Sequence, residues 1–374
     1  MRLTLSTTAL STQLNILSKV LTNKNGMPIL SSFLFEVTGN TLTITASDRE
    51  NVMKTSIPID ESDGDGTFSV AGNTMINAVK ELPEQPITLE VDTTSLSVRL
   101  NYQNGVYNFT ATNAEEYPET MTFEGDVSTL YIPSDVLSDC LSRSDFAIAS
   151  EELRPVMNGV YFDLTAEALA IVASDGHKLV RNKIYDIKTE IPTSFVLPKK
   201  PVLLLKNVLA KDDSSVVIRF DKKMAEISFG NSQLTCRLLE GRYPNYNAVI
   251  PKENPNVIVI DRKILLGIMK RVLPFSNESS NLVRMHVETG KMIVSSEDID
   301  FATSAKEEVV CDYVGTNINI GFKGLSFVDI LSNLASDDVR IELADPSRPC
   351  LVLPEQQPEK EEVLMLTMPM LLND

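Results

Sequence analysis

The chain has 374 residues, of which 43% are hydrophobic, and a formal net charge of −17 at pH 7. This composition is typical of a globular protein, and no apolar run approaches the roughly 20 residues that a membrane-spanning helix needs. The excess of acidic residues argues against a generally basic nucleic-acid-binding surface. Cys140, Cys236, Cys311 and Cys350 are widely spaced, which favours free thiols in a reducing cytoplasm over disulfides or a zinc site.

Along the chain, the same order of elements is predicted three times. Alternation in Met1–Ser6 predicts an opening strand rather than a signal peptide. A first helical pattern then recurs in 9–24, 134–146 and 261–273. A strand with a shared sequence follows it, at Leu42–Asp48, Leu169–Asp175 and, more weakly, Lys291–Glu297. A second helical pattern lies in 72–82, 198–211 and 321–336, and alternating strands such as Ile87–Val91 fill the rest of each copy.

The copies are about 125 residues apart, far more than the roughly 20–50 residues of a solenoid repeat, so each copy is predicted to be a domain. Proline-containing polar stretches separate the copies and give the domains 1–125, 126–253 and 254–374. Two helices and several strand pairs in each copy predict an α+β fold, with three tandem similar domains in which helices pack on β-sheets.

Charge is unevenly distributed between the predicted helices and the rest of the chain. The six helical segments together carry +7, which leaves −24 for the remainder. One interpretation is a set of ordinary solvated helix faces. The other is a shared positive surface that faces an anion while the rest of the protein repels it.

Motifs for catalysis or metal binding are weak. Ser174, Asp175 and His177 are the residue types of a hydrolase triad, but they are nearly consecutive, whereas a triad converges from separate elements. The acidic segment Asp60–Gly66 suggests a calcium loop. If Gly66 is the sixth position of that loop, however, the twelfth falls on Gly72, where a bidentate glutamate is needed. No glycine-rich phosphate-binding motif is present. The sequence therefore predicts no catalytic residues, no metal and no cofactor.

The C-terminal end carries an uncharged, mostly apolar run, Val363–Leu372, after an acidic segment. A final strand is predicted here, and it should stop at Pro369 because proline has no N–H to donate to a ladder. Flexible methionines near a surface, here Met368 and Met370, suit adaptable peptide binding.

Four motifs, together with the triplication, resemble those of a known family over the whole chain. They are Met27–Leu30, Ser174–Leu179, Glu240–Tyr246 and Met368–Met370. The chain is similar to the bacterial β sliding clamps, the non-catalytic processivity subunits of DNA polymerase III. The resemblance implies a head-to-tail homodimer that forms a closed ring of six domains. Helices would line the hole of this ring, which would encircle double-stranded DNA without sequence specificity.

The resemblance also implies three groups of functional residues. A pocket between the second and third domains would bind short linear peptides of the replicative DNA polymerase, the clamp loader and repair enzymes. Its residues would be Arg154, Met157, Ser174, Gly176, His177, Leu179, Pro244, Val249, Leu366, Met368, Pro369 and Met370. The residues facing DNA would be Lys19, Lys24, Lys80, Arg143, Lys199, Lys200, Lys206, Lys263, Lys270 and Arg271. The dimer interface would pair Tyr107 and Phe109 with Pro274 and Phe275.

Two other classes of function stay open at the level of residues. One is a three-domain β-rich scaffold that binds a partner without encircling DNA. The other is an enzyme, for which the sequence offers no nucleophile–base pair or metal set. The resemblance favours a cytoplasmic replication protein with no membrane contact.

Overall fold

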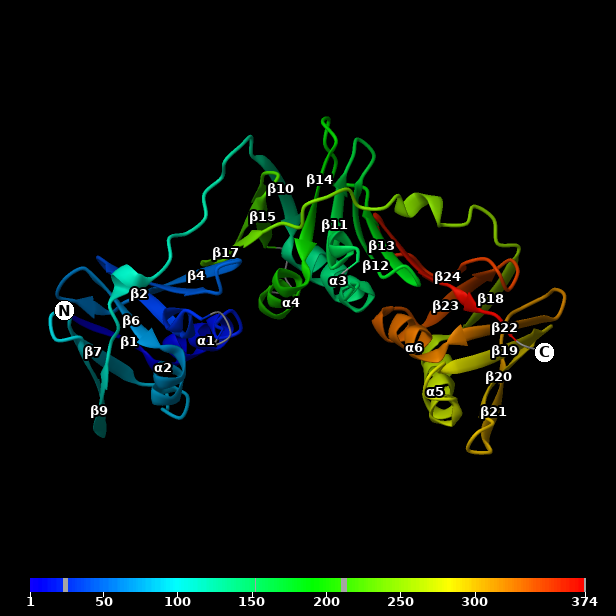
Figure 1. Cartoon of the computed structure of the whole chain (residues 1–374), viewed down its shortest axis with the longest axis horizontal. Coiled ribbons are helices and arrows are strands. Elements are labelled where there is room, and N and C mark those ends of the chain that lie inside the picture. The colour runs from blue at the N-terminus through cyan, green and yellow to red at the C-terminus, as the bar shows by residue number, and fades with distance from the viewer. Residues whose placement is uncertain (23–25, 152, 210–213, 373–374) are drawn as a thin grey trace. The chain divides into compact units, whose positions relative to one another are not determined.

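The computed structural model describes residues 1–22, 26–151, 153–209 and 214–372. The chain forms two compact units, Met1–Ser138 with Leu203–Leu238, and Asp139–Val202 with Leu239–Asp374. The central part of the sequence is therefore shared between the units. Two of the boundaries between the units, after Ser138 and after Val202, fall within the sequences of α3 (Ser134–Ser144) and α4 (Lys199–Val208), which are labelled in Figure 1.

The first unit contains two antiparallel sheets, with the strand orders β5-β1-β7-β8-β9 and β10-β15-β16-β17-β4-β3-β2-β6. The strands of the smaller sheet are β1 (Arg2–Ser6), β5 (Glu61–Ser62), β7 (Pro86–Asp92), β8 (Ser97–Tyr102) and β9 (Gly105–Thr110). Those of the larger sheet are β2 (Ser32–Thr38), β3 (Thr41–Ser47), β4 (Asn51–Pro58), β6 (Gly66–Ala71), β10 (Ser128–Pro133), β15 (Ser215–Phe220), β16 (Met224–Phe229) and β17 (Ser232–Arg237). The unit also holds α1 (Thr7–Leu17), α2 (Gly72–Val79) and the short 3-10 helices η1 (Pro28–Ser31) and η2 (Ala114–Glu116).

The second unit has the same plan, with the strand orders β14-β11-β12-β13-β25-β24-β23-β18 and β21-β20-β19-β22-β26. The larger sheet consists of β11 (Gly159–Leu164), β12 (Leu169–Ser174), β13 (Lys178–Ile184), β14 (Thr193–Pro198), β18 (Asn256–Asp261), β23 (Asp338–Leu343), β24 (Cys350–Pro354) and β25 (Glu361–Thr367). The smaller sheet consists of β19 (Leu282–Glu288), β20 (Lys291–Asp298), β21 (Thr303–Val310), β22 (Ile318–Lys323) and β26 (Pro369–Met370). The helices are α5 (Arg262–Val272), α6 (Gly324–Asn333), η3 (Asp145–Ala147), η4 (Pro155–Met157), η5 (Tyr246–Ala248) and η6 (Leu273–Phe275).

The three sequence copies fold in the same register. In each copy, the strand before the shared motif pairs with the strand that leads into the second helix. At the equivalent position the facing residues are Phe35 and Phe68, Phe162 and Phe195, and Met285 and Ile320. The two phenylalanine pairs stack with ring centroids 5.0 and 4.6 Å apart, and all six side chains are buried. The second helix then begins directly after the paired strand, at Gly72, Lys199 and Gly324. Three matching registers support a common domain plan with a core of the same design.

Each copy contributes strands to two sheets, and neighbouring copies share the larger sheets. The fourth strand of the first copy, β4, pairs with β17, the last strand of the second copy. In the same way, β13 of the second copy pairs with β25 of the third. The equivalent strands at the two ends, β9 of the first copy and β21 of the third, each lie at the edge of a five-stranded sheet.

The structure departs from the predicted elements at two places. The first helix ends at Leu17, well before the end of the predicted 9–24 segment, where the Ser18 hydroxyl donates to the carbonyl of Asn15 at 2.7 Å. Serine competes for backbone groups in this way and disfavours helix continuation. The last strand, β25, ends at Thr367 as expected, but Pro369 and Met370 then pair with β22 of the other sheet.

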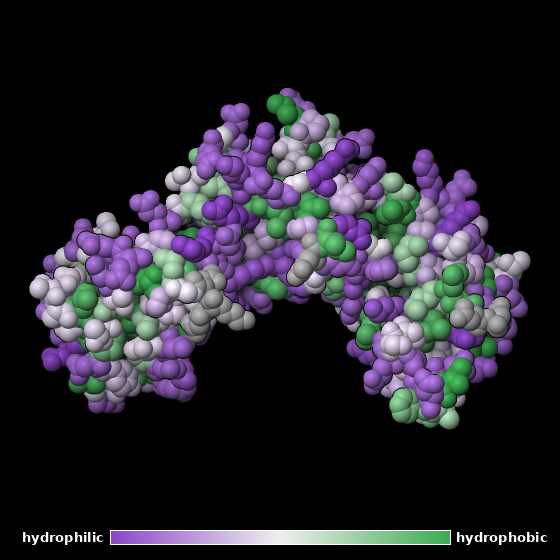
Figure 2. Space-filling view, viewed as in Figure 1, coloured by the Kyte–Doolittle hydropathy of each residue, from purple (hydrophilic) through white to green (hydrophobic). Residues whose placement is uncertain are grey.

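In the face shown in Figure 2, hydrophilic side chains predominate and hydrophobic ones are scattered between them. All four cysteines are buried and free, and burial raises the pKa of the Cys236 thiol to about 12. These thiols therefore serve as apolar core residues, as predicted. Among the described residues, no helix is long and apolar enough to cross a membrane.

Candidate functional site

A cavity of about 200 Å³ lies in the second unit, beside the turn between β12 and β13. Ten of the twelve residues predicted for the pocket line it. They are Arg154, Met157, Ser174, Gly176, His177, Leu179, Pro244, Val249, Leu366 and Met368. Pro369 and Met370 are not among the lining residues and belong to β26. Lys178, Tyr243, Asn245 and Tyr246 also line the cavity.

The floor of the cavity is apolar and closely packed. Met157, Leu179 and Leu366 are buried in one hydrophobic cluster with Tyr243 and Tyr246. The Tyr243 ring stacks on Tyr161 with centroids 4.6 Å apart, and the Tyr246 hydroxyl donates to Asp163 at 2.8 Å. Burial raises the pKa of both Tyr243 and Tyr246, so both phenols are neutral at physiological pH.

The mouth of the cavity combines exposed apolar and polar side chains. Val249 is 50% exposed and Met368 is 36% exposed, although both are large apolar residues. The Arg154 guanidinium is 3.8 Å from Glu151 and remains more than half exposed. An apolar groove with a few polar groups is suited to anchoring apolar side chains of a ligand and fixing their orientation.

Hydrogen bonds hold the β12–β13 turn in shape. The Ser174 hydroxyl donates to the carbonyl of Lys178 at 2.8 Å and accepts from the N–H of Gly176 at 3.1 Å. One oxygen of Asp175 accepts the N–H groups of His177 and Lys178 at 2.9 and 2.8 Å. Gly176 has φ +90°, and a Cβ there would lie 3.4 Å from Arg154. The positive φ favours glycine in this turn, because side-chain-bearing residues are strained there, whereas the contact with the flexible Arg154 side chain would be tolerated. Ser174 and Asp175 hold the turn together through backbone groups, and among the described residues neither side chain is hydrogen-bonded to the imidazole of His177, as a catalytic relay would require.

The C-terminal segment closes the opposite side. The N–H of Met368 donates to the carbonyl of His177 at 2.9 Å. Strand β25 also pairs with β13, with Leu366 opposite Leu179. The cavity thus depends on the last residues of the chain, which approach residues almost 200 positions earlier in the sequence.

Most of the basic residues predicted to face DNA lie at the surface. Lys19, Lys80, Lys199, Lys263 and Lys270 are exposed, and Lys200 and Lys206 are partly exposed. Arg271 is exposed but forms a bidentate contact with Glu307 at 2.8 and 2.6 Å. Lys24 lies outside the described residues.

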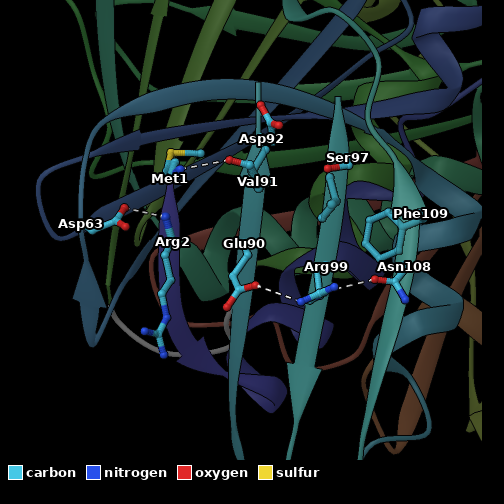
Figure 3. Close-up of a pocket in the computed structure, with 11 residues that line it drawn as sticks. Met1, Arg2, Asp63, Glu90, Val91, Asp92, Ser97, Arg99, Asn108 and Phe109 are labelled. Atoms are coloured by element: carbon cyan, nitrogen blue, oxygen red, sulfur yellow. Dashed lines mark hydrogen bonds and ion pairs between the residues drawn. The ribbon is translucent and has the colours of Figure 1, made fainter. Parts of the chain in front are cut away.

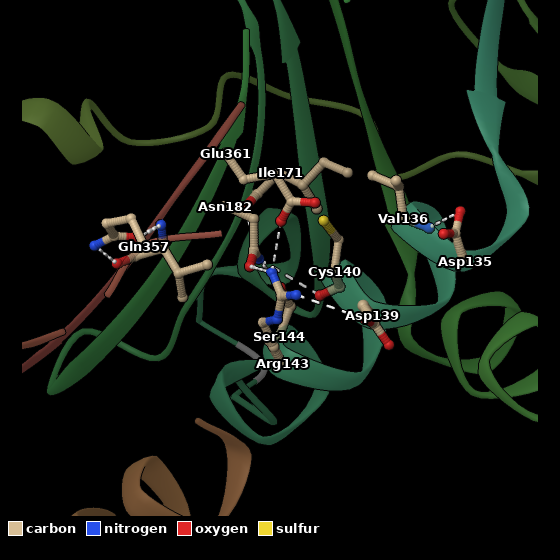
Figure 4. A network of polar contacts seen from close by, with 11 residues as sticks. Asp135, Val136, Asp139, Cys140, Arg143, Ser144, Ile171, Asn182, Gln357 and Glu361 are labelled. Carbon is tan, nitrogen blue, oxygen red and sulfur yellow. Dashed lines mark hydrogen bonds and ion pairs between the residues drawn. The ribbon is translucent and has the colours of Figure 1, made fainter. Parts of the chain in front are cut away.

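Arg143 differs from the other basic residues because its side chain is only 12% exposed. Its guanidinium lies 2.9 Å from Glu361 and 3.6 Å from Asp139, and it donates to Asn182 at 3.3 Å (Figure 4). The arginine therefore joins α3 to the start of β25. Its charge is largely compensated inside the protein, which leaves little of it for an external phosphate.

The residues predicted for the dimer interface are all available at the surface. Tyr107 is 37% exposed and Phe275 is 40% exposed, while Pro274 is exposed and Phe109 is partly buried. Tyr107 and Phe109 lie on the edge strand β9. A shallow cavity of about 590 Å³ adjoins this strand on the sheet's polar face, where Arg99 contacts Glu90 and Asn108 (Figure 3).

The sequence interpretation missed Lys178, Tyr243, Asn245 and Tyr246 as lining residues. The last three belong to the Glu240–Tyr246 motif, of which only Pro244 was assigned to the pocket. The motif was therefore a usable signal. Lys178 lies in the Ser174–Leu179 motif and had the same signal, whereas its ion pair with Asp329 depends on a residue far away in the sequence. Within the part of the chain that the structure describes, no cluster of His, Cys, Asp or Glu could hold a metal ion.

The chain resembles curated proteins and solved structures along its full length. It is 27% identical to the beta sliding clamp of Caulobacter vibrioides, covering 98% of this chain and 99% of that protein. It is 25% identical to the beta sliding clamp of Pseudomonas putida over 100% of both chains. The crystal structure of the DNA polymerase III beta subunit of Thermotoga maritima matches with 27% identity, a TM-score of 0.89 and complete coverage of both chains. The corresponding Pseudomonas aeruginosa structure gives 24% identity, a TM-score of 0.92 and complete coverage of both chains.

The triplicated fold and these matches define a sliding clamp, a class of non-catalytic processivity factors in DNA replication. Three family models cover nearly the whole chain. They are the N-terminal, central and C-terminal domains of the DNA polymerase III beta subunit, which match residues 1–122, 131–245 and 247–370. The chain belongs to the DNA polymerase III beta subunit family.

Proposed function

We propose that two copies of this chain close head to tail into a ring of six repeats, 1–125, 126–253 and 254–374 from each copy. The ring encircles double-stranded DNA and tethers the replicative polymerase, the clamp loader and repair enzymes. The partners bind through short linear peptides in the cavity beside Gly176 and Met368. The protein acts in the cytoplasm, where bacterial DNA lies.

One observation supports the ring most directly: equivalent strands make each junction between repeats. Strand β4 pairs with β17, and β13 pairs with β25. The equivalent pair at the ends of the chain is β21 and β9, and each is an edge strand. Joining β21 of one copy to β9 of the next repeats the internal junction a third time. A head-to-tail contact uses different surfaces on the two copies. Repeating this contact gives a closed ring when the rotation between successive copies adds up to one full turn.

The internal junctions also suggest a register for this contact. In the first junction, Thr235 of β17 lies opposite Val52 of β4. The residues in matching hairpin positions are Asn108 in β9 and Ala305 in β21, so we expect these two residues to face each other across the interface. Tyr107 and Phe109 would then meet Pro274 and Phe275 on the helix side of the joined sheet.

The charge distribution supports a hole that faces DNA. The predicted helical segments carry +7 in a chain whose remainder carries −24. Lys199 and Lys263 lie in the first turns of α4 and α5, and Lys80 and Lys270 near the ends of α2 and α5. Such lysines can hold phosphate by long-range attraction without reading bases, which is compatible with sliding.

The apolar cavity supports peptide docking. It combines a closely packed tyrosine floor with exposed Val249 and Met368 at its mouth. Apolar side chains of an extended peptide would bury against this floor, while the exposed Arg154 guanidinium would attract acidic or carbonyl groups of the ligand.

The ring is tested by loading the protein on nicked circular DNA with its clamp loader and ATP, followed by gel filtration. We expect it to stay bound to the circle and to be released when a single cut linearises the DNA. The physical reason is that a closed ring leaves the DNA by sliding off a free DNA end, which a circle does not have. Equal retention on circular and linear DNA, or retention without a loader, would contradict the ring.

A further inference from the structure

Lys178 lines the cavity, and its ammonium has acidic partners on two elements. Its side chain is 13% exposed, and Nζ lies 3.6 Å from Asp175 and 3.6 Å from Asp329. Asp175 is in the β12–β13 turn, and Asp329 is on helix α6. Nζ also lies 5.5 Å from the centroid of the Phe146 ring in η3. Three separate elements therefore converge on one lysine of the cavity wall.

The first repeat shows how the equivalent position is built at the other junction between repeats. Asn51 is the counterpart of Lys178 in the first repeat. Each is the first residue of its strand, and Val52 and Leu179 follow them at equivalent positions. The backbone N–H and the side-chain amide of Asn51 donate to Asp48 at 2.7 and 3.1 Å. That turn is closed locally by a neutral residue. The helix position equivalent to Asp329, the sixth residue of the second helix, is the buried Leu204.

The second repeat thus replaces a neutral, local closure by an ion pair that reaches a helix of the third repeat. We propose that Lys178 is a positioning residue of the peptide-binding cavity. It ties the turn bearing Gly176 and His177 to α6 through Asp175 and Asp329, and so fixes the cavity wall before a peptide arrives. This inference rests on the proposed role of the cavity in peptide binding.

The physical consequence is preorganisation. A wall that is already ordered does not lose conformational freedom when a ligand binds, so more of the contact free energy contributes to affinity. Without the ammonium, Asp175 still accepts two backbone N–H groups, so the turn keeps its local shape but loses its connection to α6. Asp329 is not among the residues that line the cavity but contacts the lining residue Lys178, which makes it a sensitive test of positioning.

The probe is a fluorescein-labelled peptide selected on the wild-type protein by phage display, and the readout is its Kd by fluorescence anisotropy. We expect Lys178→Met to weaken binding about fivefold to twentyfold, and Asp329→Asn to weaken it about threefold to tenfold. The double variant should bind within about twofold of Lys178→Met, because both changes break one connection. Lys178→Arg, which keeps the charge, should bind within about twofold of wild type.

Lys183→Met is the matched control, since Lys183 lies on the same strand, outside the cavity, and pairs with Glu167 at 3.9 Å. It should bind the peptide as wild type does. Unchanged affinity in Asp329→Asn, or additive effects in the double variant, would overturn the positioning role.

A variant with both Met368→Ala and Met370→Ala distinguishes failure of the proposed peptide site from failure of the positioning role. If that variant still binds the peptide with wild-type affinity, the cavity is not the peptide site. If it loses binding while Lys178→Met does not, only the positioning role fails.

Discussion

Glu362 illustrates how one carboxylate stabilises the junction between β13 and β25. Its carboxylate contacts the Arg181 guanidinium on the neighbouring strand and accepts the Tyr185 hydroxyl at 2.8 Å. Burial alone would raise the pKa of Glu362, but the Tyr185 hydrogen bond and the Arg181 charge outweigh it and hold the pKa below its usual value. The ionised form is therefore favoured by folding, which makes this junction sensitive to acid.

We predict that Glu362→Gln lowers the melting temperature by about 2 °C at neutral pH, a modest effect because the group is partly solvated. A lowered folded-state pKa gives stability that is complete above the unfolded value of 4.5 and is lost as pH falls through the folded value. The difference from wild type should therefore shrink below about pH 4.5 in a calorimetric pH series. Glu359→Gln, at an exposed position, is the control. A difference that grows on acidification would contradict the account.

At the scale of elements, the edge strand β9 is built to accept another strand. It joins β8 by a two-residue turn, with Tyr102 opposite Gly105. In such a hairpin the residues flanking the turn exchange hydrogen bonds, so the groups of every second residue point outward. By this alternation, the N–H groups of Val106, Asn108 and Thr110 face away from β8 and are available to a partner copy.

We predict that Asn108→Pro weakens dimerisation at least about tenfold, because it removes an outward N–H and places a ring against the partner strand. The fold of each copy should survive, since proline is tolerated where the N–H does not serve the sheet. Analytical ultracentrifugation against concentration measures the dimer Kd. The control is Asn108→Ala, which removes the same side-chain contact with Arg99 but keeps the backbone N–H. Its dimer Kd should stay near that of wild type. A proline variant that dimerises normally would exclude β9 from the interface.

Local periodicity was sufficient to predict many of the elements, because most helices and many strands bury one face. Alternation placed β7, and the 3.6-residue pattern placed α5 and α6 within a few residues. Periodicity carries no information about which strands pair across repeats, so the β4–β17 and β13–β25 junctions could not be predicted from it. The same limit applies to Lys178, whose partner Asp329 is 151 positions away and gives no local signal.

At the scale of the whole molecule, attachment to DNA should depend on closure rather than on charge. A protein held by phosphate contacts loses affinity steeply with salt, since each contact releases a counterion. We predict that the half-life on nicked circular DNA changes by less than about threefold between roughly 0.1 and 0.5 M NaCl, whereas binding to linear DNA falls by orders of magnitude. Surface plasmon resonance on immobilised DNA with blocked and free ends compares the two. A steep salt dependence on the blocked DNA would mean that direct contacts, not closure, hold the protein.

The β13–β25 junction has a consequence for biosynthesis. Strand β13 ends at Ile184, and its neighbour β25 begins only at Glu361. At ribosomal rates of about 5–20 residues per second, the edge of β13 waits roughly 10–35 s for the strand that covers it. An open edge is a template for wrong pairing, so the nascent chain is exposed to aggregation until β25 emerges. The two units therefore differ in their folding order: both sheets of the first unit have all their strands once Arg237 has been made, whereas the larger sheet of the second unit waits for β25.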